Sequence, residues 1–151
     1  MGLESANYYF KIKRLLTKEV VEKIFIGDRF FLKNKKGNLL YCDFDYWIDI
    51  MFVGDESEFN ILSIRIALCN PVAGIEHSFK KLLQFLFSKF PSAELIDLNT
   101  KATINHFDEV AWNVIWNYYK ARRIAFSNRY GHLELPVSSE LFFKYIDEKE
   151  G

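Results

Sequence analysis

The chain has 151 residues, of which 50% are hydrophobic and 17% aromatic, so it can bury the core of one domain and does not have the composition of a disordered chain. Basic and acidic residues balance at twenty each, which excludes the strongly basic class of nucleic-acid-binding proteins. No apolar run approaches the ~20 residues that a membrane span needs, and the N-terminus lacks the apolar core of a signal peptide. We therefore predict one cytoplasmic domain over residues 1–151, with no membrane span and no nucleic-acid partner.

The first part of the chain predicts one extended or helical segment followed by a helix. Residues 7–16 mix aromatic and basic side chains, and they suit either a strand or the start of a helix. Thr17 carries the hydroxyl expected of an N-cap and is followed by an acid in the first turn. We expect this short helix to end near residues 26–27.

A β-hairpin is expected next, with strands over residues 29–33 and 39–47 and a glycine in the turn between them. Acidic residues alternate with apolar ones along the second strand and beyond it, at Asp43, Asp45 and Asp49. This alternation is the period of a sheet with one solvated face. Paired carboxylates for acid–base chemistry are the alternative interpretation.

The centre of the chain predicts a strand–helix–strand unit. Residues 60–68 form a buried strand, residues 69–75 hold the turn-forming residues, and residues 76–90 place apolar side chains at helical spacing. Residues 94–98 form a second buried strand. Two parallel strands joined by a helix make a right-handed crossover. We therefore predict an α/β (α+β) fold in which helices flank a mixed sheet.

A long helix is predicted over residues 108–124, followed by strands at residues 132–135 and 141–146. Its expected buried face consists of Val110, Ala111, Val114, Ile115, Tyr118 and Tyr119, widened by Trp112 and Trp116. Basic residues near its end complement the helix dipole. The order of all these elements resembles that of the GNAT-type acyltransferase fold.

Few residues carry a chemical signal, and each also has a structural interpretation. His77 opens the central helix, where it is a candidate general base or anion ligand, or simply a surface residue. Cys42 and Cys69 lie in apolar surroundings and are expected to be buried, reduced thiols. A set of basic residues is a candidate dock for an anion or an acidic protein, or an ordinary basic helix end: Lys120, Arg122, Arg123 and Arg129.

Four places in the chain resemble the toxin-activating lysine acyltransferases, the HlyC-like family that fatty-acylates RTX toxins. The hairpin segments 29–32 and 39–42 look like the family's hairpin, and residues 66–67 look like the end of its central strand. The Lys-Phe-Pro sequence at 89–91 is similar to the family's helix ending. A pattern on the late helix matches at Asp108, Asn113, Ile115, Trp116 and Tyr119.

This resemblance implies a GNAT-like fold and transfer of a fatty acyl chain to lysines of a protein acceptor. An acyl carrier protein or acyl-CoA would be the co-substrate, and no cofactor would be bound permanently. Ser5 matches a serine near the family's N-terminus, but Tyr8 stands where the family has its catalytic histidine, and Ile64 stands where it has an aspartate. The resemblance therefore makes Ser5, Tyr8 and a shifted base at His77 the candidate catalytic residues.

Two hypotheses follow. In the first, an acyltransferase holds its donor thioester in a V-shaped gap between the two central strands, where backbone N–H groups polarise the carbonyl. The donor would lie against Asn70, Ala73, Gly74 and Ile75. In the second, the chain is a non-catalytic protein-binding domain, such as a toxin-immunity protein or a pseudo-enzyme. A homodimer is left open in both.

Overall fold

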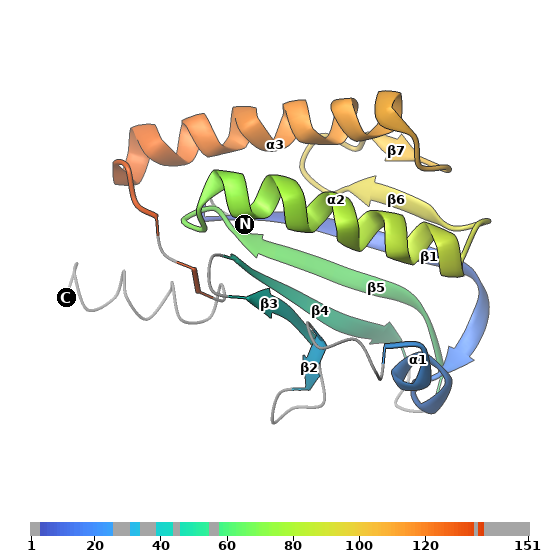
Figure 1. Cartoon of the computed structure of the whole chain (residues 1–151). Coiled ribbons are helices and arrows are strands. Elements are labelled where there is room, and N and C mark those ends of the chain that lie inside the picture. Colours follow the sequence, from blue (N-terminus) through green and yellow to red (C-terminus); the bar gives the residue numbers. More distant parts are fainter. Residues whose placement is uncertain are drawn as a thin grey trace.

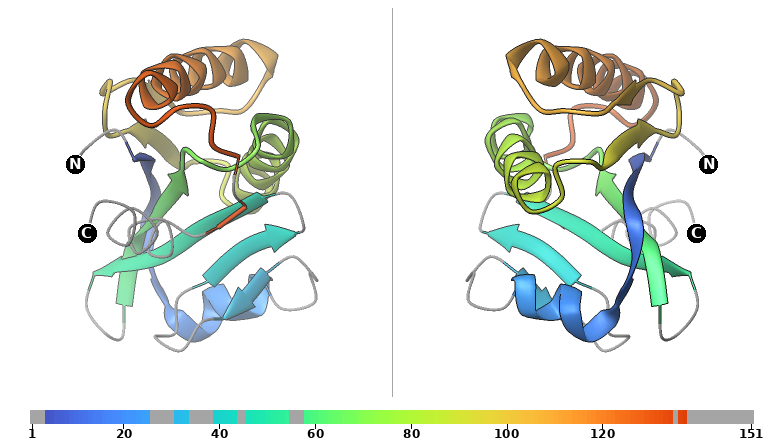
Figure 2. Two further views of the ribbon diagram at one scale, coloured as in Figure 1. Left: turned by 90° about the vertical axis from the view of Figure 1, so that its left-hand side faces the viewer. Right: turned by 90° about the vertical axis from the view of Figure 1, so that its right-hand side faces the viewer.

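The computed structural model describes residues 4–25, 31–33, 39–43, 46–54, 58–134 and 136–137. These residues form an α+β fold, as predicted, in which helices α2 and α3 cover the same face of one curved sheet (Figures 1 and 2). The elements in chain order are β1 (Ser5–Thr17), α1 (Lys18–Phe25), β2 (Phe31–Lys33), β3 (Leu39–Asp43), β4 (Tyr46–Gly54), β5 (Glu58–Ala67), α2 (Val72–Lys89), β6 (Glu94–Asp97), β7 (Thr103–Ile104) and α3 (Glu109–Tyr130).

The sheet has seven strands in the order β2-β3-β4-β5-β1-β6-β7, and every neighbouring pair is antiparallel. The first strand of the chain lies at an interior position. Tyr8 on β1 is opposite Ile64 of β5 on one side and opposite Asp97 of β6 on the other. The two strands of the central unit therefore run in the same direction, but they are not neighbours.

The predicted mixed sheet with a V-shaped gap between its central strands is wrong for this reason. A gap between β5 and β6 would leave the edges of both strands without hydrogen-bond partners in the interior. Instead β1 occupies the whole space between them, and its pairing continues to the ends of both strands. There, the Leu68 N–H donates to the Glu4 carbonyl and the Leu98 N–H donates to the Asn7 carbonyl.

Several local predictions are confirmed and others are corrected. Thr17 caps α1, because its hydroxyl accepts a hydrogen bond from the Val20 N–H at 3.3 Å. The single strand predicted over residues 39–47 is wrong, since the chain reverses after Asp43 and β3 pairs with β4. Asp43 and Asp49 consequently lie on two different strands. Asp45 and the predicted turn over residues 34–38 lie outside the described residues.

The helices begin and end at other residues than predicted. Helix α2 starts at Val72 instead of residue 76, so part of the expected turn forms its first turn. Helix α3 extends to Tyr130, six residues beyond the prediction, and the short strand β7 was not predicted. Residues 132–134 are not a strand, and the predicted strand over residues 141–146 lies outside the described residues.

The core forms where α2 contacts both the sheet and α3. Phe79 of α2 lies against Tyr8 of β1, with ring centroids 4.9 Å apart, and against Trp112 of α3 at 5.8 Å. Phe10 of β1 meets Phe87 edge-on at 5.1 Å. Aromatic side chains at alternate positions of β1 thus hold α2 on one face, and Phe79 connects α2 to α3.

We predict that Phe79→Ala lowers the free energy of unfolding by about 3–5 kcal/mol, because it leaves a cavity at the junction of β1, α2 and α3. Urea unfolding followed by tryptophan fluorescence measures this loss. The exposed substitution Val110→Ala is the control, and it should change the free energy by no more than about 0.5 kcal/mol. A loss below about 1 kcal/mol for Phe79→Ala would contradict the packing.

Candidate functional site

Tyr8, a predicted catalytic residue, is buried inside the sheet–helix core. Only 1% of its surface is exposed, and its hydroxyl has no hydrogen-bond partner among the residues that the structure describes. Burial, and next the carboxylate of Asp97, raise the pKa of Tyr8 well above its usual value. The side chain is therefore a neutral phenol that can donate a proton to a hydrogen bond but is not poised to act as a base.

The other predicted catalytic residues are not brought to Tyr8. The Ser5 hydroxyl is buried, where it accepts hydrogen bonds from Asn7 Nδ2 at 3.2 Å and from Arg65 Nε at 3.4 Å. His77 is exposed, although Phe79, two residues later on α2, faces Tyr8. Two residues apart on a helix, the side chains point in widely different directions. The described residues thus contain no serine–tyrosine–histidine constellation.

The candidate catalytic position Tyr8 lies opposite Ile64 in the β1–β5 ladder. Directly opposed side chains in antiparallel strands lie next to each other on one face. At this point of the sheet the chain therefore places a phenol beside an isoleucine.

The predicted donor-binding segment is part of the framework. Asn70 is buried, and its Nδ2 donates to the carbonyls of Ala67 at 2.8 Å and Val137 at 3.0 Å. The Ile75 N–H donates to the Pro71 carbonyl at 3.1 Å and so belongs to the helix. Ala73 is exposed, whereas Gly74 and Ile75 are buried against the core. The three residues form the first turn of α2 instead of a loop around a ligand.

The basic residues of α3 divide into two groups. Arg122 donates to the Ser5 carbonyl, and Arg123 is buried, donating to the Leu133 carbonyl while lying 5.0 Å from the centre of the Phe126 ring. These two guanidinium groups hold α3 in place. Lys120 and Arg129 are exposed and remain accessible to a partner. Of the four residues predicted as a basic dock, Lys120 and Arg129 therefore remain as candidates for binding a partner.

Helix α3 has apolar side chains on its solvent side, which the sequence did not predict. Trp112 stacks on Trp116 at 5.4 Å, and Trp116 stacks on Tyr119 at 4.9 Å, so these rings take the inner face. The predicted burial of Val110, Val114 and Tyr118 is consequently wrong. We define the α3 outer face as five exposed residues: Val110, Val114, Tyr118, Ala121 and Ile124.

The sequence does contain a signal for this surface. The helix has more large apolar residues in three turns than one face can bury, so some of them must face the solvent. Their exposed fractions are 73% for Val110, 40% for Val114, 42% for Tyr118 and 63% for Ile124. Periodicity alone did not identify which set is outside, because the inner set is decided by the aromatic stacking against α2.

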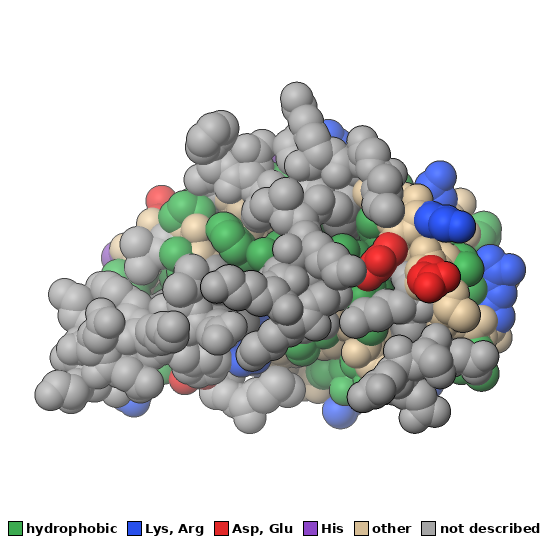
Figure 3. All heavy atoms as spheres, turned by 90° about the horizontal axis from the view of Figure 1, so that it is seen from below, with side chains coloured by type: hydrophobic (Ala, Val, Ile, Leu, Met, Phe, Trp, Pro, Cys, Tyr) green, Lys and Arg blue, Asp and Glu red, His purple; other side chains and the backbone are tan. Residues whose placement is uncertain are grey.

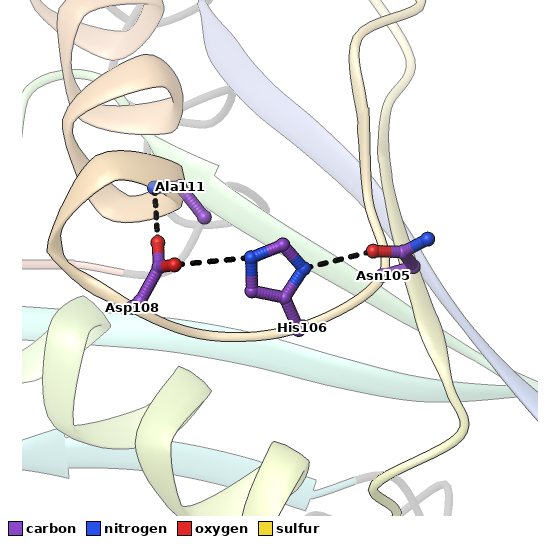
Figure 4. Close-up of polar contacts among 4 residues, drawn as sticks. All are labelled: Asn105, His106, Asp108 and Ala111. Atoms are coloured by element: carbon purple, nitrogen blue, oxygen red, sulfur yellow. Dashed lines mark hydrogen bonds and ion pairs between the residues drawn. The ribbon is translucent and has the colours of Figure 1, made fainter.

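The start of α3 is fixed by a small polar network (Figure 4). Asp108 is the N-cap, and its Oδ1 accepts a hydrogen bond from the Ala111 N–H at 2.7 Å. The ring nitrogens of His106 contact Asp108 Oδ2 at 3.0 Å and Asn105 Oδ1 at 2.9 Å. Both ring nitrogens of this exposed histidine contact oxygens of neighbouring residues, so it supports the start of the helix.

Two surface cavities lie at the far end of α2. One, of about 270 Å³, lies between residues 12–14 of β1 and residues 89–93. The other, of about 350 Å³, lies between the end of α2 and residues 106–107. Neither cavity includes Tyr8 or His77 among its lining residues.

Other chemical possibilities are restricted in the same way. Burial raises the pKa of the Cys69 thiol to about 12, so it is not a ready nucleophile. The described part of the chain has no cluster of three or more histidine, cysteine, aspartate or glutamate side chains that could hold a metal ion. Among its helices, none has both the length and the apolarity that crossing a membrane requires.

No known protein family, curated protein or solved structure matches this chain. The functional proposal therefore rests on the side chains described above, and the α3 outer face is their most distinctive surface feature.

We predict that Asp108→Ala lowers the melting temperature by about 2–4 °C through loss of the N-cap, whereas Asp108→Asn retains most of the capping. Hydrogen bonding from the Ala111 N–H, and next from His106, lowers the pKa of Asp108. Its stabilising contribution is therefore complete above the pKa of the unfolded chain and is lost as the pH falls through the folded-state pKa.

Thermal unfolding between pH 7 and pH 3 tests this prediction. The Asp108→Asn protein should lose less stability on acidification than the wild type, because it has no carboxylate to protonate at this cap. Parallel pH profiles for the two proteins would contradict the assignment.

Proposed function

We propose that this chain is a protein-binding domain that docks a partner protein on the α3 outer face. The observation that supports this proposal is the exposure of Val110, Val114, Tyr118 and Ile124 along one helix. The solvent side of a surface helix normally carries charged or polar residues, and contiguous exposed apolar groups are typical of interaction sites. Helical spacing places these residues along the length of α3.

Aromatic contacts on the inner side of α3 hold the docking face in place. Trp112, Trp116 and Tyr119 stack in series on the inner side of α3, and Phe79 links Trp112 to the sheet. The ion pair between Lys80 of α2 and Glu109, at 2.7 Å, adds a contact at the helix start. A surface that is already ordered loses less conformational entropy on binding, which favours affinity.

Charge indicates what kind of partner fits. Helix α3 begins with Glu109 and has no acidic residue after it. Lys120 and Arg129 are exposed in its second half. By contrast, the surface seen from below displays acidic side chains beside basic ones at one end (Figure 3). A partner with an apolar groove rimmed by carboxylates would complement the α3 outer face, and the opposite charges would steer the encounter.

The acyltransferase interpretation stays a prediction that no observation tests. It requires an acyl donor, an acceptor protein and an acid–base group that can reach both. The gap in which the donor was expected is occupied by β1, and Tyr8 is buried and neutral. A domain that presents an apolar helix face to solvent is more simply explained as a binding module.

The experiment compares apolar-to-glutamine substitutions on α3 with the same kind of substitution on β1. Val110→Gln combined with Ile124→Gln removes apolar surface from α3 while keeping good helix propensity. Leu15→Gln is the control, because Leu15 is as exposed as Ile124, at 63%, but lies on β1. A photo-cross-linking residue at position 114 identifies the partner in cells, and isothermal titration calorimetry then gives its dissociation constant with each purified protein.

We expect the double variant to weaken binding at least tenfold, because truncated hot-spot contacts cost more than ~1 kcal/mol each, and Leu15→Gln to leave it unchanged. Equal weakening by both variants would contradict the assignment to α3. So would cross-linking only to a second copy of the chain. Acyl transfer from an acyl carrier protein or acyl-CoA by the purified protein would contradict a purely binding role.

A further inference from the structure

Five buried side chains on β1, β6, α3 and the turn after β5 have polar atoms without a hydrogen-bond partner among the described residues. The atoms are the hydroxyls of Tyr8 and Tyr119, Asp97 Oδ2, Asn70 Oδ1, and Nε and Nη1 of Arg123. We call this set the buried polar strip. Buried polar atoms in folded proteins nearly always have a partner, because leaving one without costs free energy. So many in one region require an explanation.

The members of the strip lie on elements that face each other. Asp97 is directly opposite Tyr8 in the β1–β6 ladder, so the two side chains share one face of the sheet. Tyr119 and Arg123 are one turn apart on α3 and both are buried. The hydrogen bond from Arg122 to the Ser5 carbonyl holds this part of α3 on β1. The strip therefore has members on β6, β1 and α3 and, with Asn70, in the turn after β5.

The remaining hydrogen-bonding capacity is mixed in character. Asp97 Oδ1 already accepts from the N–H groups of Asn99 and Thr100, at 2.9 Å and 3.2 Å, while Oδ2 still needs a donor. Arg123 uses Nη2 on the Leu133 carbonyl, and its Nε and Nη1 nitrogens remain as donors. Each tyrosine hydroxyl needs an acceptor and can also accept. The strip thus offers both donors and acceptors.

We propose that the buried polar strip binds ordered internal water, which links Tyr8 and Asp97 on the sheet to Tyr119 on α3. Water both donates and accepts, and a buried water is held by two to four polar partners, as the strip provides. A bound anion would be repelled by the Asp97 carboxylate, and a bound metal cation by the Arg123 guanidinium. A neutral molecule that both donates and accepts hydrogen bonds is compatible with Asp97 and with Arg123.

This water would connect α3 to β1 through hydrogen bonds in addition to the aromatic contacts. It would also pay part of the desolvation cost of burying Asp97, whose carboxylate is 1% exposed. The inference is independent of the proposed partner, since the strip lies on the inner side of α3.

Nuclear magnetic resonance on the wild-type protein tests the proposal directly. Hydroxyl protons of Tyr8 and Tyr119 that are hydrogen-bonded and buried exchange slowly enough to be observed, and they should show nuclear Overhauser contacts to water. Assignment follows from their disappearance in Tyr8→Phe and Tyr119→Phe. Tyr9→Phe is the matched control, because Tyr9 is the next residue of β1 and points to the other face of the sheet.

Stability measurements give an independent readout. We expect Tyr8→Phe and Tyr119→Phe each to lower the melting temperature by about 2–4 °C, and the double variant to lose less than the sum. Tyr9→Phe should change it little. Equal or raised melting temperatures in both Phe variants, or additive losses with no water contacts at either hydroxyl, would overturn the proposal.

Discussion

The structure depends on one strand that satisfies the hydrogen bonds of two others. β1 pairs with β5 from Ser5 onward and with β6 over residues 8–11, so the first strand of the chain closes the interior of the sheet. Without β1, the edges of β5 and β6 would face each other without partners, and burying unpaired backbone groups is costly. This pairing also sets the direction of its side chains: Tyr8 and Phe10 face the helices, while Ser5 and Asn7 face the other side. The positions of α2 and α3 follow from that alternation.

The same arrangement separates the interior of the molecule from the proposed docking surface. On the inner side, Phe79 joins Tyr8 to Trp112, and α3 is anchored by stacked aromatic rings and by the Arg122 and Arg123 contacts. On the outer side, α3 presents valine, isoleucine and tyrosine side chains to solvent. A helix that is apolar on both sides contributes to the core and remains able to bind. Between β5 and β6 lies β1, which pairs with both strands.

The sequence predicted the elements whose signals are local. The strands β5 and β6 agree with the predictions to within two residues, because both are apolar runs bounded by turn residues. The Thr17 cap was also recognised, since an N-cap needs only the residues that follow it. The interior position of β1 was not predictable in this way, because it depends on pairing with residues 41 to 62 positions away on β5 and 83 to 89 positions away on β6. The orientation of α3 failed for a related reason: valine and tryptophan count equally in a periodicity, but only stacking against α2 decides which faces inward.

Native-state hydrogen exchange at the backbone amides of residues 8–11 tests the interior position of β1 most directly. Successive amides of a strand point to opposite neighbours, so pairing on both sides should protect all four, with exchange only through global unfolding. If β5 and β6 instead enclosed a gap beside β1, every second amide would exchange through local opening. Uniform protection is the predicted result, and alternating fast exchange along residues 8–11 would contradict the structure and restore the case for a ligand between these strands.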